Sequence, residues 1–141
     1  MKDSTPGTLL SFDVGEKRTG VAIGQTISGT TRPLETLTTR DGAQDFEAIE
    51  KLIKEYQADA LVVGMPLNMD GTEQSMTNIA RKFGRRLEGR FHLPVHFVDE
   101  RLSSWEAEQG GEKIPGKKTG IDARAACIIL DDWMQQNGFK A

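Results

Sequence analysis

The chain has 141 residues, which suits one compact domain, and we predict a single domain over residues 1–141. Apolar residues make up 37% and charged residues 28%, and no run approaches the roughly 20 apolar residues that span a bilayer. The net charge of −3 argues against nonspecific coating of nucleic acid, but it does not exclude a local basic face.

The first part of the chain has the pattern of three strands. Residues 8–13 and 19–25 are apolar runs joined by a tight turn, and residues 32–38 form a plausible third strand. Pro33 places the start of that strand near a sheet edge, because proline cannot donate a hydrogen bond to a neighbour. Since the three runs are close in sequence, we expect an antiparallel meander.

The rest of the chain alternates between helical and strand patterns. Helical spacing of apolar residues predicts helices, and short apolar runs predict strands, in this order: helix 41–56, strand 60–64, helix 72–90, strand 94–99, short helix 104–109, basic loop 110–120 and helix 122–137. Strand–helix–strand crossovers require parallel pairing. The sequence therefore predicts an α/β fold, with a mixed five-stranded sheet and helices on both faces.

The single cysteine, Cys127, lies among apolar residues of the last predicted helix and cannot form an internal disulfide. The first residues are polar and lack the apolar core of a signal peptide. We therefore expect Cys127 to be a core thiol and the protein to be cytoplasmic.

Three acidic residues stand at informative places. Asp13 ends the first predicted strand, Glu100 follows the last strand, and Asp122 opens the last helix. Sites in open α/β sheets form outside the carboxyl ends of the strands. If the first strand and the last two strands run the same way, Asp13 and Glu100 share one edge. Asp122 reaches that edge if the last helix packs across it.

Three converging carboxylates repel one another unless a cation intervenes, and Mg²⁺ or Mn²⁺ would suit their oxygen atoms. Such a site would hydrolyse a phosphodiester, with one cation or with two about 4 Å apart. Each acid also has a structural explanation. Asp122 could be a helix N-cap, Glu100 part of a solvated ion pair, and Asp13 a turn residue that accepts backbone hydrogen bonds.

A nucleic-acid substrate also needs cations near the acids. Basic residues adjoin each acidic motif, and the candidates for substrate binding are Lys17, Arg18, Arg101, Lys117 and Lys118. Asn68, in the loop after the fourth strand, could bind a phosphate, a base edge or its own loop backbone. Lys82, Arg85 and Arg86 on the second long helix fit a solvated helix face.

Four segments together resemble one family. They are Asp13-Val14-Gly15 with Lys17-Arg18-Thr19-Gly20, Val63-Gly64-Met65-Pro66-Leu67-Asn68, Val98-Asp99-Glu100-Arg101-Leu102-Ser103, and Ile121-Asp122-Ala123-Arg124-Ala125-Ala126. In this order and at these spacings they resemble the YqgF family, also called RuvX, of bacterial Holliday junction resolvase-like proteins.

The resemblance implies an RNase H-like fold and a metal-dependent nuclease that matures the 5′ end of pre-16S rRNA. The acids carried over from the family would be Asp13, Glu100 and Asp122. Resolvases outside the family tend to carry an acid at the end of the fourth strand. This chain has Gly64-Met65-Pro66 there, so the second metal ligand would have to come from Glu100.

Three other functions are compatible with parts of the sequence. The first is a resolvase-like endonuclease acting on branched DNA, and the second is a noncatalytic factor that binds nucleic acid or the ribosome. The third is an ATP-binding module, because actin-like and sugar-kinase proteins also open with an Asp-x-Gly hairpin. Those proteins need two such domains, far more chain than this one has, and no Walker-type glycine-rich motif occurs here.

Overall fold

A computed structural model describes residues 7–39, 44–100 and 118–139, and only the backbone of residues 118–121. Five strands form one sheet in the order β3-β2-β1-β4-β5. The elements are β1 (Thr8–Val14), β2 (Arg18–Gln25), β3 (Thr30–Thr38), α1 (Phe46–Tyr56), β4 (Ala60–Pro66), α2 (Ser75–Phe91), β5 (Val95–Glu100) and α4 (Lys118–Gln136).

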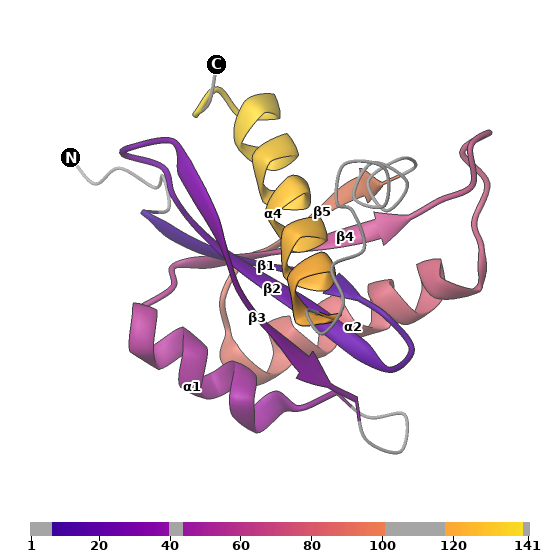
Figure 1. Cartoon of the computed structure of the whole chain (residues 1–141), viewed down its shortest axis with the longest axis horizontal. Helices are drawn as coiled ribbons and strands as arrows, with labels where there is room; N and C mark the ends of the chain where they lie inside the picture. Colours follow the sequence, from indigo (N-terminus) through magenta and orange to yellow (C-terminus); the bar gives the residue numbers. More distant parts are fainter. Residues whose placement is uncertain (1–6, 40–43, 101–117, 140–141) are drawn as a thin grey trace.

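The sheet confirms the predicted topology. Strands β1, β2 and β3 pair as an antiparallel meander, whereas β4 pairs in parallel with both β1 and β5. The carboxyl ends of β1, β4 and β5 therefore lie at one edge of the sheet. Figure 1 shows α4 crossing one face of this sheet, with α1 and α2 covering the other face.

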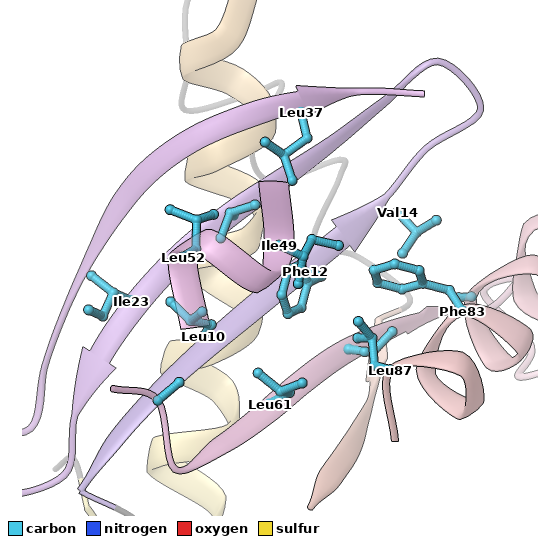
Figure 2. Packing of buried hydrophobic residues seen from close by; sticks show 14 of the residues in the cluster. Leu10, Phe12, Val14, Ile23, Leu37, Ile49, Leu52, Leu61, Phe83 and Leu87 are labelled. Atoms are coloured by element: carbon cyan, nitrogen blue, oxygen red, sulfur yellow. The ribbon is translucent and has the colours of Figure 1, made fainter. Parts of the chain in front are cut away.

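Two hydrophobic clusters hold these layers together. On the face covered by α1 and α2, Phe12 and Phe83 meet edge-to-face with ring centroids 5.5 Å apart, among buried leucines and valines (Figure 2). On the opposite face, Leu9 and Val62 pack against Ile129 of α4. Successive strand residues point to opposite faces of the sheet. A strand residue that belongs to one cluster therefore has neighbours in sequence that point to the other face.

Small residues of β2 allow α4 to lie close to the sheet. A methyl group added at Gly20 would stand 1.9 Å from the Asp122 carbonyl oxygen, and one at Gly24 would stand 2.7 Å from Leu130 Cδ2. The buried Ser11 hydroxyl of β1 also donates a 2.7 Å hydrogen bond to the Ala126 carbonyl oxygen. The backbone of α4 is thus held at two points along its first turns.

Ser11→Ala is expected to lower the free energy of unfolding by about 1 kcal/mol, because a buried hydrogen bond between the sheet and α4 is lost. Urea unfolding monitored by circular dichroism would measure the change. An unchanged midpoint would show that this bond adds nothing to the attachment of α4.

The ends of three predicted helices were wrong. The first helix starts at Phe46, because the Asp45 side chain accepts a hydrogen bond from the Ala48 amide and caps it. The second runs over Ser75–Phe91. The last begins at Lys118, so Asp122 lies one turn inside α4 and is not its N-cap. The helix predicted at 104–109 and most of the predicted basic loop lie outside the described residues.

Among the helices that the structure describes, none combines the length and the apolar character that crossing a bilayer requires.

Candidate active site

Asp13 lies near the carboxyl end of β1 on the face that α4 covers. Leu9 and Ser11 precede it on the same face, the first packed against α4 and the second hydrogen-bonded to it. The turn after β1 is tight, since the Gly15 amide donates to the Arg18 carbonyl oxygen over 2.8 Å. This turn returns the chain directly beside Asp13.

The electrostatic environment of Asp13 is unfavourable for a lone carboxylate. Burial, followed by the negative charge of Asp122, raises the pKa of Asp13 from 3.8 to about 7. Strand β1 and helix α4 are distant in sequence, yet they bring these two acids close enough to interact. A cation placed between them would relieve both causes of the raised pKa.

Asp122 is held by an ion pair with Arg18, the first residue of β2. Arg18 Nε donates to Asp122 Oδ2 over 2.8 Å, and the two side chains are 48% and 22% exposed. Such a pair orients the carboxylate more than it stabilises the fold, because solvent screens it. It also places a guanidinium, a common phosphate ligand, at the edge that carries the acids.

Glu100 ends β5 on the same face as Asp13 and is buried, with 7% of its surface exposed. Strand β4 lies between the strands that carry the two acids, and the Ile129 side chain of α4 packs against its Gly64. A methyl group at Gly64 would stand 3.2 Å from Glu100 Cγ, although Glu100 pairs in register with Pro66, two residues farther along β4. The Glu100 side chain therefore leans back along the sheet to lie beside Gly64, next to Ile129 of α4.

The three predicted acids thus lie on one face at one edge, but they are not clustered equally. Asp13 and Asp122 interact electrostatically, whereas Glu100 lies on β5, on the other side of β4. Among the described residues, no three His, Cys, Asp or Glu side chains are close enough to hold one metal ion together. The oxygen donors still fit Mg²⁺ or Mn²⁺, because such ions are often bound by one or two carboxylates with water completing the shell.

The predicted substrate-binding residues have different surroundings. Lys17 is exposed in the β1–β2 turn, and Arg18 bonds Asp122 beside it. The Asn68 amide donates to Thr72 Oγ1 over 3.0 Å, so it braces its own loop. Two further candidates, Arg101 and Lys117, and the side chain of Lys118, lie outside the described residues.

Two glycines shape the site, and the sequence indicated only the first of them. Gly20 admits the α4 backbone beside Asp13, and Gly64 leaves room for the side chains of Ile129 and Glu100. The signal for Gly20 was present, because Gly20, Ala22 and Gly24 place only small residues on one face of β2. Gly64 gave no such signal, because its role depends on the register between β4 and β5.

The fold is that of RNase H-like resolvases. Thermus thermophilus RuvC in complex with a Holliday junction substrate superposes with a TM-score of 0.56 and 14% identity, covering 93% of this chain and 96% of RuvC. The fowlpox virus Holliday junction resolvase superposes with a TM-score of 0.56 and 13% identity, covering 92% of this chain and 99% of that protein.

Sequence comparison then defines the family. The model of the family described as "RuvX: Holliday junction resolvase" matches residues 7–136. A protein of Escherichia coli O157:H7 named "Putative pre-16S rRNA nuclease" is 51% identical over 135 residues, covering 92% of this chain and 97% of the relative. A protein with the same name from Escherichia coli O7:K1 is 50% identical over the same coverage. The chain belongs to the RuvX family.

Proposed function

We propose that this protein is a metal-dependent nuclease that hydrolyses phosphodiester bonds in the 5′-end maturation of pre-16S rRNA, in the cytoplasm. The observation that carries the proposal is the position of Asp13 beside Asp122 at the carboxyl edge of the sheet, where burial, followed by the negative charge of Asp122, raises the pKa of Asp13 to about 7. A divalent cation bound by two acids held in this way would offset the repulsion between their negative charges. The name of the relatives supplies the RNA substrate.

In this proposal Asp13, Asp122 and Glu100 hold Mg²⁺ or Mn²⁺. The cation would supply electrostatic stabilisation of the charge that develops on the phosphoryl group and would lower the pKa of a bound water. Arg18 orients Asp122 in the metal-free protein and contacts a substrate phosphate when RNA is bound. Lys17, Arg101, Lys117 and Lys118 would add further phosphate contacts, and Asn68 a contact from its braced loop.

A second candidate substrate is branched DNA. The fold matches that of a resolvase bound to a Holliday junction, and the family model carries the same description. The fold alone does not choose between the substrates, since both are phosphodiesters that the same acids would attack.

The test compares cleavage of two substrates by the purified protein, a pre-16S rRNA with its 5′ leader and a four-way DNA junction. Each is incubated with Mg²⁺, with Mn²⁺ or with a chelator. We expect leader cleavage with either metal and none with the chelator, because the acids alone would repel the phosphate. Cleavage that persists in chelator would contradict the proposed metal dependence. Faster cleavage of the junction than of the leader RNA would contradict the proposed RNA substrate.

A further inference from the structure

Helix α2 concentrates positive charge on a protein whose net charge is −3. It carries five basic residues and one acid, Glu88. Two of the basic residues have partners, because Arg81 pairs with Glu73 and the Arg90 guanidinium lies 4.3 Å from the centre of the Phe46 ring. The remaining three are exposed, and no carboxylate of the described residues lies within 4 Å of them: Lys82, Arg85 and Arg86.

Two of these cations border a crevice between the start of α1 and the flank of α2. Its lining consists of Gln44, Ile79, Lys82, Phe83 and Arg86. Lys82 and Arg86 are four residues apart and so lie on the same side of the helix. Ile79 is 41% exposed, so the crevice combines an apolar surface with two cations. This combination suits a phosphate backbone with its attached sugar and base.

The crevice connects to the acids through the start of β2. The Thr19 hydroxyl donates to Gln44 Oε1 over 2.7 Å on the face of α1 and α2. The preceding residue, Arg18, bonds Asp122 on the face of α4. Arg18 and Thr19, neighbours on β2, therefore contact the acidic site and the crevice respectively. The two sites lie at the same end of the sheet on opposite faces.

We propose that the crevice formed by Gln44, Ile79, Lys82, Phe83 and Arg86 is a second, sequence-independent binding site for the phosphates of a nucleic acid. A strand bound at the acids would pass over the carboxyl edge of the sheet and place its flanking phosphates beside Lys82 and Arg86. This inference rests on the proposed function for the nature of the ligand. It extends the substrate path from the α4 face to the α2 face.

The test measures the affinity of the whole protein for a fluorescein-labelled single-stranded RNA by anisotropy, over a series of KCl concentrations in chelator, with the RNA checked for integrity. Lys82→Ala with Arg86→Ala should weaken binding. The slope of log affinity against log salt should become shallower by about 1.4, because each lost phosphate contact on a single strand changes it by about 0.7. Lys82→Arg with Arg86→Lys should keep the wild-type slope, since both charges remain.

The matched control is Lys51→Ala with Lys54→Ala, which removes the same charge from exposed positions of neighbouring α1. It should leave the slope at the wild-type value. Equal loss of affinity in both alanine pairs would overturn the inference, because it would show a general effect of net charge. An unchanged affinity in the Lys82/Arg86 pair would overturn it as well.

Hydrolysis of bis(p-nitrophenyl) phosphate with Mn²⁺ separates this inference from the proposed function. That small diester reaches the acids without crossing the crevice, so the Lys82/Arg86 alanine pair should hydrolyse it at the wild-type rate. A wild-type protein that does not hydrolyse it would count against the nuclease, while the RNA-binding measurement would still decide the crevice. Lost hydrolysis in the folded alanine pair would contradict a site separate from the acids.

Discussion

Asp13→Asn is expected to abolish RNA cleavage and, at the same time, to stabilise the metal-free protein at pH 8. The loss of activity should exceed the roughly 10- to 100-fold change that follows loss of an outer-shell partner, because a proposed metal ligand is removed. The gain in stability follows from the raised pKa of Asp13, since the amide cannot ionise next to Asp122.

The sign of the pH effect follows from the two states. Asp13 has a pKa of about 7 in the folded protein and an ordinary value of 3.8, so between these values the folded state keeps a proton that the unfolded state has lost. Stability contributed by this group is therefore present below about pH 4 and is lost as the pH rises to 7. The difference between the two pKa values corresponds to at most about 4 kcal/mol of unfolding free energy. We expect a loss of about 2 kcal/mol, because solvent reaches part of the site.

Urea unfolding of the wild type and of Asp13→Asn at pH 5 and pH 8, in chelator, measures this effect. The wild type should lose stability between the two values and the variant should lose less. Mg²⁺ should then raise the melting temperature of the wild type and not that of the variant, because binding to the folded state alone stabilises it.

Asp99→Asn is the matched control, because this exposed acid neighbours Glu100 but points to the opposite face of β5. It should cleave RNA like the wild type. If Asp13→Asn cleaves at a comparable rate, Asp13 is not a metal ligand. If the stability of the variant depends on pH as that of the wild type does, Asp13 is not a strained carboxylate.

The sequence predicted the sheet and the edge that carries the acids, because both follow from local patterns. Continuous apolar runs identify strands that are covered on both faces, and the helices between them require parallel pairing. The parallel pairs β1–β4 and β4–β5 place Asp13 and Glu100 at the same edge, as expected from their positions at strand ends.

The details of the site depend on contacts between distant residues, which no local pattern contains. Arg18 and Asp122 are 104 residues apart in the chain, and their bond follows only from the close packing of α4 on β2. The start of α4 was misplaced for a related reason. Gly120 suggests a loop from its low helix propensity, but a penalty of about 1 kcal/mol does not end the helix, which runs through it.

Gly20→Ala is expected to lower both stability and cleavage, because the new methyl group would occupy the place of the α4 backbone. The nearest atom is the Asp122 carbonyl oxygen, only 1.9 Å from that position, and a backbone atom cannot rotate away as a side chain can. Overpacking of this kind costs about 1–3 kcal/mol. Moving the start of α4 also moves the Asp122 carboxylate away from Asp13, and a displacement of about 1 Å can reduce a rate about 100-fold.

Gly89→Ala is the matched control, since no heavy atom lies within 4 Å of the added methyl group on the surface of α2. It should stabilise the protein by about 0.5–1 kcal/mol, because alanine is a better helix former than glycine. Combining both substitutions should therefore recover part of the stability lost in Gly20→Ala without recovering cleavage.

Cleavage rates are compared well below the melting temperature of each variant, where all are folded. Under that condition a rate defect in the Gly20→Ala, Gly89→Ala double variant reports the position of Asp122 and not the fraction of folded protein. Cleavage at the wild-type rate in that variant would mean that the close approach of α4 to β2 does not position Asp122 for the reaction. The active site would then have to be assembled without the last helix.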